Sequence, residues 1–161
     1  MRDASGMTFD CPMNTALPSA SILEPGILTS IWLVHDLTCD DPHVGDHFVA
    51  VDYAVELQFS ESAPLEISFS EGAYDLVTIE YARPSESLNE RKLNGADFGK
   101  LGALIGKRVS SVCVVDDATA EIMFDDVVCR VVGGQWDGIG SFLSPVDHFD
   151  CLFVAVVSRK S

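Results

Sequence analysis

Histidines and carboxylates that could bind a metal ion gather in one short stretch of the chain. Three of the four histidines lie there among aspartates, and the set is His35, Asp36, His43, Asp46 and His47. Imidazole nitrogens and carboxylate oxygens are ligands that Zn²⁺ and similar ions accept. The stretch has no His-Glu-x-x-His pattern, and its proline and glycine are typical of a loop. The sequence therefore favours solvated loop histidines, with a metal site on His35, His43 and His47 as the alternative.

Thiol chemistry is a second possibility, because the chain has five cysteines. They are widely spaced and odd in number, and no Cys-x-x-Cys occurs, which argues against a disulfide framework. Cys113, Cys129 and Cys151 lie in apolar runs, where a free cysteine behaves as a small buried hydrophobe rather than a nucleophile. We expect reduced core thiols, as in a cytoplasmic protein.

Other catalytic signatures are missing from the sequence. It contains no Gly-x-Ser-x-Gly elbow, no Gly-x-x-x-x-Gly-Lys loop and no Gly-x-Gly-x-x-Gly. A pair of catalytic carboxylates needs one pKa raised by burial, whereas the acids here alternate with apolar residues along strands and should be solvated. The sequence predicts a protein that is not an enzyme and that needs no cofactor.

A glycine-rich stretch near the C-terminus carries aromatic residues. Gly133–Gly140 reads Gly-Gly-Gln-Trp-Asp-Gly-Ile-Gly, and no lysine follows it, so we predict a flexible loop rather than a phosphate cradle. Trp136 and Phe142 lie in this predicted loop. They could be exposed anchors for a partner, or they could fold back and cap the sheet.

The balance of charge is the most informative global feature. The chain has 25 acids against 10 lysines and arginines, a net charge of −15, and no lysine or arginine occurs between Arg2 and Arg83. Such a surface repels nucleic acid and anionic membranes, and it attracts a basic protein and speeds the encounter. Acidity that only keeps the protein soluble is the alternative.

The acids of the first half are predicted to share one region of the surface. Alternation with apolar residues places Asp52, Glu56, Glu66 and Glu80 on or beside one sheet face, with Glu71 and Asp75 at its turns. Like charges side by side cost stability, and a cation-rich partner would remove that cost. The predicted partner-binding residues are Asp52, Glu56, Glu66, Glu71, Asp75, Glu80 and Trp136, and a merely solvated face is the alternative.

The elements that must position these residues are mostly strands. Residues 1–25, with three prolines, predict an irregular arm, and residues 26–161 predict a single β-rich domain. Ile27–Thr38 predicts a strand or a short helix. The clearest strand is His47–Ser60, which residues 65–69 and Tyr74–Ala82 extend into an antiparallel meander.

The second half repeats this layout after a short helix. Ala96–Ile105 predicts the helix, with Asn94 or Asp97 as its cap and Gly106 as its end. Strands at Arg108–Val115, Thr119–Phe124 and Val127–Val132 predict a second meander, 133–150 a long loop, and Cys151–Ser158 a central final strand. The predicted fold class is mainly β (α+β): a curved antiparallel sheet, sandwich or partly open barrel of two meanders with one short helix.

Three features resemble small acidic bacterial immunity proteins of polymorphic or contact-delivered toxin systems. They are the hairpin Val55-Glu56-Leu57-Gln58-Phe59 … Leu65-Glu66-Ile67-Ser68-Phe69, the helix-to-strand run Leu104-Ile105-Gly106-Lys107-Arg108-Val109, and the acidic meander without a catalytic signature. The resemblance points to no specific family and transfers no site residues. It implies a non-catalytic protein that occludes a toxin's basic active site.

We therefore expect a cytoplasmic, acidic binding protein with a basic protein partner and no nucleic-acid or membrane contact. The apolar runs are too short to span a bilayer, and the first residues lack the apolar segment of a secretion signal. Two alternatives remain open. One is a small-ligand or metal-binding β-domain using the 35–47 region or Gly133–Gly140, and the other is a structural or oligomerisation domain.

Overall fold

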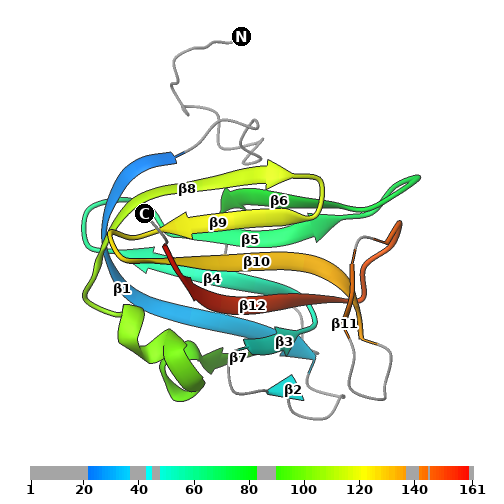
Figure 1. Ribbon diagram of the computed structural model, residues 1–161, viewed down its shortest axis with the longest axis horizontal. Coiled ribbons are helices and arrows are strands. Elements are labelled where there is room, and N and C mark those ends of the chain that lie inside the picture. Colours follow the sequence, from blue (N-terminus) through cyan, green and yellow to red (C-terminus); the bar gives the residue numbers. More distant parts are fainter. Residues whose placement is uncertain are drawn as a thin grey trace, which may run out of the picture.

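The protein is a two-layered arrangement of antiparallel strands (Figure 1). The computed structural model describes residues 22–36, 43–44, 48–82, 90–136, 142–144 and 146–159. Within these residues the paired strands follow the order β2-β3-β12-β10-β9-β8-β1-β4-β5-β6, which does not close on itself. The mainly-β prediction is confirmed. None of the described helices has the length and apolar character needed to cross a lipid bilayer.

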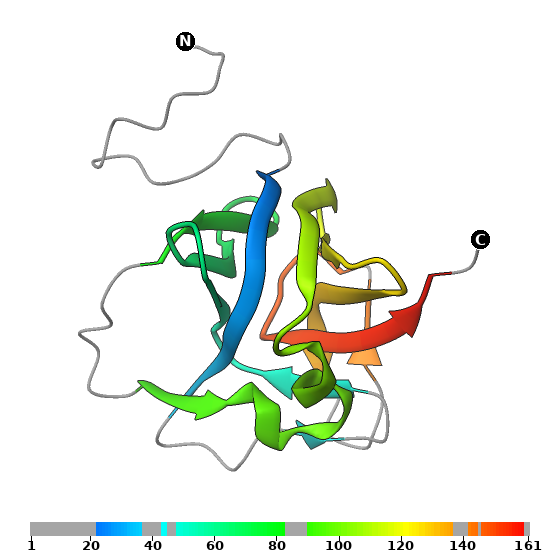
Figure 2. The same cartoon turned by 90° about the vertical axis from the view of Figure 1, so that its left-hand side faces the viewer.

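The long strand β1 (Ile22–Asp36) belongs to both layers, as Figure 2 shows from the side. Its first residues pair with β8 (Arg108–Asp116), and the following stretch pairs with β4 (Ala54–Phe59). Its end also pairs with β7 (Glu90–Asn94). The predicted arm of residues 1–25 is therefore wrong at its C-terminal boundary, because the strand begins at Ile22, and residues 1–21 lie outside the described residues.

A β-bulge allows β1 to change partners. The register with β8 shifts between Leu23 and Gly26, and Glu24 and Gly26 have positive φ angles of 51° and 117°. An extra residue on one strand bends it and increases its twist. The alternative of a short helix at Ile27–Thr38 is excluded up to Asp36, where the described strand ends.

The first layer is the meander that the sequence predicts. β4, β5 (Leu65–Ser70) and β6 (Leu76–Tyr81) pair in succession, all antiparallel. The prediction of one strand at His47–Ser60 is wrong, because the chain turns at Asp52 and Tyr53 and places β3 (Phe48–Val51) in the other layer. Alternation of apolar residues continues through a corner, so periodicity alone could not locate it.

The second layer contains the second meander and the final strand. β8, β9 (Thr119–Met123) and β10 (Val127–Trp136) form the meander, which is confirmed. β12 (Cys151–Ser158) lies between β10 and β3, as expected of a central strand. The short strands β2 (His43–Val44) and β11 (Phe142–Leu143) extend this layer at β3 and β10.

The core fills the space between the layers. Leu57 and Ile67 of the first layer face Ile122, Val131 and Leu152 of the second, and all five side chains are fully buried. Burying one such side chain stabilises the fold by roughly 1.5–3 kcal/mol. The core therefore holds the two outer faces, where the candidate sites lie, at fixed positions.

The predicted helix at Ala96–Ile105 is two short 3₁₀ helices, η1 (Gly95–Asp97) and η2 (Gly99–Leu104). The Asn94 side chain accepts a hydrogen bond from the Ala96 N–H at 3.0 Å, which confirms the predicted cap. Gly106, the predicted end of the helix, has a positive φ of 92°. Three glycines in such a short segment disfavour a regular α-helix.

Candidate functional site

Three predicted glutamates form one row across the first layer. Glu56 of β4 lies directly opposite Glu66 of β5, which lies opposite Glu80 of β6. The prediction that these residues share a sheet face is confirmed. Trp32 of β1 stands beside Glu56 in the same row.

The expectation that this row is solvated is wrong for Glu56, which is 7% exposed. The Gln58 amide donates a hydrogen bond to Glu56 Oε2 at 3.2 Å, and the Ser30 hydroxyl donates to Gln58 Oε1 at 2.8 Å. Glu66 and Glu80 are half-buried. Glu56 is therefore part of a hydrogen-bonded chain on the sheet, where a partner could reach little of it.

The predicted metal ligand His35 is buried beside Asp52. His35 is 4% exposed, and its Nδ1 lies 3.2 Å from the Asp52 N–H nitrogen and 3.3 Å from Asp52 Oδ2. A neutral imidazole accepts the N–H, whereas a protonated ring pairs with the carboxylate. These contacts place His35 at the corner between β3 and β4.

The rest of the predicted metal set is not brought together in the described part of the chain. His43 lies in β2, but its side chain and that of Asp36 are outside the described residues, as are Asp46 and His47. Among the described residues no three histidine, cysteine, aspartate or glutamate side chains are close enough to hold a metal ion. Metal binding by this region remains a prediction.

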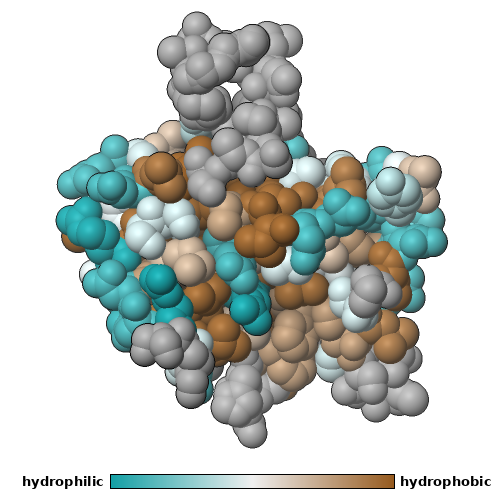
Figure 3. Space-filling model, turned by 45° about the horizontal axis from the view of Figure 1, so that its top comes forward, coloured by the Kyte–Doolittle hydropathy of each residue, from teal (hydrophilic) through white to brown (hydrophobic). Residues whose placement is uncertain are grey.

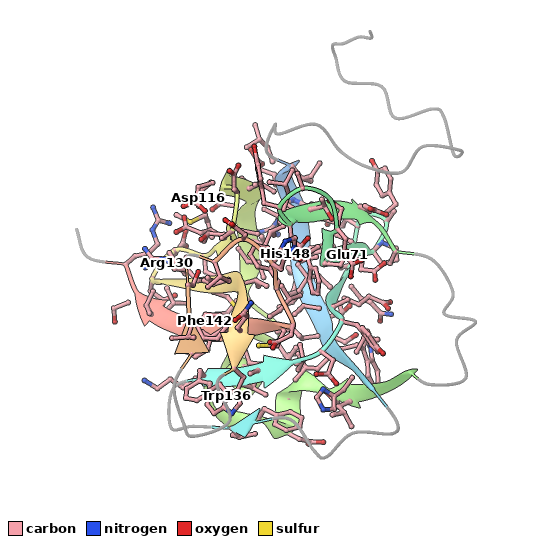
Figure 4. All side chains as sticks on the ribbon, turned by 90° about the vertical axis from the view of Figure 1, so that its right-hand side faces the viewer. Glu71, Asp116, Arg130, Trp136, Phe142 and His148 are labelled. Carbon is pink, nitrogen blue, oxygen red and sulfur yellow. The ribbon has the colours of Figure 1, made fainter. Side chains whose placement is uncertain are left out.

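Connections from both layers meet at one end of the molecule, which Figure 4 views end-on. The Val77 N–H donates to the Asp117 carbonyl at 2.8 Å, and the Asp75 N–H donates to the Asp147 carbonyl at 2.7 Å. These bonds join the β5–β6 turn, the β8–β9 turn and the segment before β12. Glu71, Asp116 and His148 mark the three connections in the figure.

Asp75 holds this end together from inside. It is 4% exposed, its Oδ2 accepts the Phe149 N–H at 2.8 Å, and its Oδ1 lies 3.4 Å from His148 Nδ1. The hydrogen bond from Phe149 and the contact with His148 hold the pKa of Asp75 below its ordinary value. The expectation of a solvated, partner-facing Asp75 is wrong, because this carboxylate is used to bind the neighbouring segment.

Four acids at this end are exposed, and we call them the acidic end: Glu71, Asp116, Asp117 and Asp147. Within the described part of the chain no lysine, arginine or histidine makes an ion pair with any of them. Tyr74, 57% exposed, follows Glu71 in the same turn. Of these four acids the sequence analysis names only Glu71, because nothing in the sequence places the β8–β9 turn beside Asp147.

The predicted anchors Trp136 and Phe142 lie on the outer face of the second layer. Phe48, Phe142 and Phe153 form a stack in which Phe153 is central, with ring centroids 4.5 Å and 4.6 Å apart. Trp136 lies 5.9 Å from Phe48. All four side chains are half-buried, so Trp136 and Phe142 fold back onto the sheet, the second of the two possibilities.

The glycines before Trp136 are strand residues, and the flexible-loop prediction is wrong for Gly133–Trp136. These residues end β10, while Asp137–Gly140 lie outside the described residues. A Cβ on Gly134 would collide with the Leu143 carbonyl oxygen and lie 2.5 Å from Phe142 Cζ, and a Cβ on Gly133 would collide with the Phe149 ring. Each glycine therefore leaves space for one phenylalanine, on opposite faces of β10.

The thiols follow the sequence prediction where they are described. Cys129 and Cys151 are buried and free, and burial raises the pKa of each thiol to about 12. Cys113 is free and half-buried. Cys11 and Cys39 lie outside the described residues.

Comparisons with family models, with curated proteins and with solved structures found no match. The resemblance to immunity proteins therefore remains an expectation from the sequence. Any function must be inferred from the surfaces described above.

Proposed function

We propose that this protein is a non-catalytic binding domain whose acidic end captures a basic protein. An immunity protein that occludes a toxin's basic active site would work in this way. The observation that carries the proposal is that four exposed acids from three separate connections meet at one end, and none of them forms an ion pair with a described lysine, arginine or histidine.

Electrostatics supports a cationic partner. With a net charge of −15, the protein attracts basic molecules over long distances and raises their association rate. The acidic end concentrates charge that forms no ion pair with the described lysines, arginines or histidines. In contrast, Lys107 at the opposite end bonds Asp126 at 3.1 Å, so that pair attracts a partner less.

The geometry of the acidic end also supports binding. Its turns are tied to each other by backbone hydrogen bonds and by buried Asp75, so they need little ordering when a partner arrives. A preorganised surface loses less conformational entropy on association. Exposed Tyr74 adds an aromatic side chain of the kind enriched at the energetic centres of interfaces.

The glutamate row supports the proposal less than the sequence suggested. Glu56 is buried, and Glu66 and Glu80 are half-buried. We propose that the row adds to the general negative field, whereas Glu71 and the other members of the acidic end make the contact.

The test is binding of the protein encoded by the neighbouring gene, measured against ionic strength. The variant Asp117→Lys with Asp147→Lys changes two exposed acids whose carboxylates make no hydrogen bond or ion pair with the described residues. The matched control is Glu61→Lys with Asp125→Lys, which makes the same change in charge at exposed positions elsewhere. We expect the first variant to slow association at least about tenfold at low salt and the control to change it far less.

Equal effects of the two variants would show that only net charge matters, and the acidic end would lose its role. Binding that is indifferent to salt would contradict the proposal as a whole.

A further inference from the structure

The two outer faces of the sandwich differ sharply in polarity. The outer face of the first layer carries Ser30, Gln58 and Ser68 beside its glutamates, together with Trp32 and with Thr78, whose hydroxyl oxygen is buried. The outer face of the second layer is mainly apolar. Thr119, Glu121 and Arg130 are polar residues on this face. Its apolar residues, of which Val128 is 6% exposed, are called the apolar outer face: Phe48, Met123, Val128, Val132, Trp136, Phe142, Phe153, Ala155 and Val157.

Register separates these residues from the core. On β12, Leu152 and Val154 point inward and are buried, whereas Phe153 and Val157 alternate with them on the other side. The same alternation on β10 places Val131 in the core and Val132 outside it. Central strands of this layer are thus apolar on both faces. In Figure 3 hydrophobic side chains lie over the middle of the molecule with hydrophilic ones between them, and further hydrophilic side chains lie toward its ends.

The apolar outer face is also close to electrically neutral. Its central charges are Arg130 and Glu121, which face each other on β10 and β9 and form an ion pair at 2.8 Å. Asp150 lies at its edge, where it accepts the Trp136 N–H. A basic partner would find little to bind there, whereas a second copy of a chain of net charge −15 would meet little charge repulsion at this face.

We propose that the apolar outer face is a homodimer interface, with a second copy of this chain packed on it about a two-fold axis. A two-fold interface joins a surface to itself, so a neutral apolar face is complementary to its own copy. Stable homodimer interfaces are more apolar than the rest of a protein surface. In this arrangement both acidic ends remain free, so the inference goes beyond the proposed function and does not depend on it.

Solution mass and charge reversal at the central ion pair test the proposal. Analytical ultracentrifugation of the wild-type chain should give twice its 17.4 kDa mass at concentrations up to about 100 µM, well above a micromolar dissociation constant. Glu121→Arg would place two arginines of each copy in the interface without an acid, and we expect it to raise the dissociation constant at least about tenfold. The swapped variant Glu121→Arg with Arg130→Glu restores the pair and should restore the dimer.

A second variant probes the apolar contact directly. Val157 is 36% exposed in the single chain, so Val157→Lys should give a folded monomer. Leu23 is 71% exposed and lies away from this face, so the matched control Leu23→Lys should remain dimeric. Circular dichroism verifies folding. A monomeric wild-type chain, or a dimer that persists in both Glu121→Arg and Val157→Lys, would overturn the proposal. Asp117→Lys with Asp147→Lys should leave the dimer intact, which separates this inference from the proposed function.

Discussion

At the scale of single residues, the most consequential side chain is one whose role the sequence did not reveal. Asp75 appears in the sequence as one more acid in a turn, yet it is buried and accepts the Phe149 N–H. The sequence pattern predicts that this carboxylate binds a partner. In the structure it instead links the two layers through its hydrogen bond from the Phe149 N–H. The exposed acids around it depend on that link for their positions.

Asp75 should make the stability of the acidic end depend on pH. Its pKa is lowered from 3.8 in the folded protein, so the unfolded chain binds more protons in this range. The stabilisation is therefore present above pH 3.8 and is lost as pH falls through the lower folded pKa. Asp75→Asn should lower the free energy of unfolding at pH 7 and flatten its decline in acid, as measured by urea unfolding across pH. An unchanged acid limb in the variant would contradict this role.

The buried thiols should be chemically inert in the native protein. Because the pKa values of Cys129 and Cys151 are raised to about 12, almost no thiolate forms at pH 8, and burial blocks access. Native alkylation followed by peptide mass spectrometry should leave both residues unmodified, while Cys113, which is half-buried, reacts faster. All three should react after unfolding. Rapid native labelling of Cys129 would show that β10 opens readily.

At the scale of elements, small residues decide how strands bend and what packs on them. β1 serves both layers because of its bulge at Gly26. β10 accepts a phenylalanine on each face because Gly133 and Gly134 have no side chain. The sequence predicts a loop at Gly133 and Gly134, because it does not show which aromatic ring packs against each glycine.

Replacing Gly26 tests the bulge. Gly26→Ala requires a side chain at a φ of 117° and should destabilise the fold by about 1–3 kcal/mol. Gly72→Ala is the matched control, because Gly72 has ordinary φ and its Cβ would meet only the Tyr74 carbonyl oxygen at 3.5 Å. Chemical denaturation measures both. Equal costs at the two positions would show that the bulge is not strained.

Replacing Gly134 tests whether the Phe142 ring packs against this position of β10. Gly134→Ala should cost about 1–3 kcal/mol because its methyl group collides with the Leu143 carbonyl oxygen and with the Phe142 ring. In a Phe142→Ala background the same change should cost less, because only the collision with the Leu143 carbonyl oxygen remains and residues in contact are not additive. A double-mutant cycle by urea unfolding gives the coupling. Additive costs would mean that Phe142 does not lie on Gly134 in solution.

At the scale of the whole molecule, charge and apolar surface are segregated. Exposed acids lie at the acidic end and at other turns such as those of Glu61 and Asp125, whereas the apolar outer face is nearly neutral. Total charge alone suggested a partner somewhere on an acidic meander. In the tertiary structure the exposed acids that could bind a partner lie instead on turns from both layers. The structure also shows a second surface, the apolar outer face, which is apolar rather than charged.

Salt should stabilise the folded protein. Repulsion within a chain of net charge −15 is strong at 10 mM salt, where the Debye length is about 30 Å, and weak near 1 M, where it is about 3 Å. The urea midpoint should therefore rise with sodium chloride. The rise should be smaller in Asp117→Lys with Asp147→Lys, which carries less negative charge. A midpoint that falls with salt would indicate that attractive ion pairs dominate instead.

The sequence by itself determined the fold class, both meanders, the cap at Asn94 and the shared face of Glu56, Glu66 and Glu80. These follow from local periodicity and turn chemistry, which depend on neighbours along the chain. Only the tertiary structure decided that the chain turns a corner at Asp52, that Asp75 is buried against Phe149, and that Glu71 shares an end with Asp117 and Asp147. Such contacts join residues far apart in sequence, and one strand's alternation does not show what covers either of its faces.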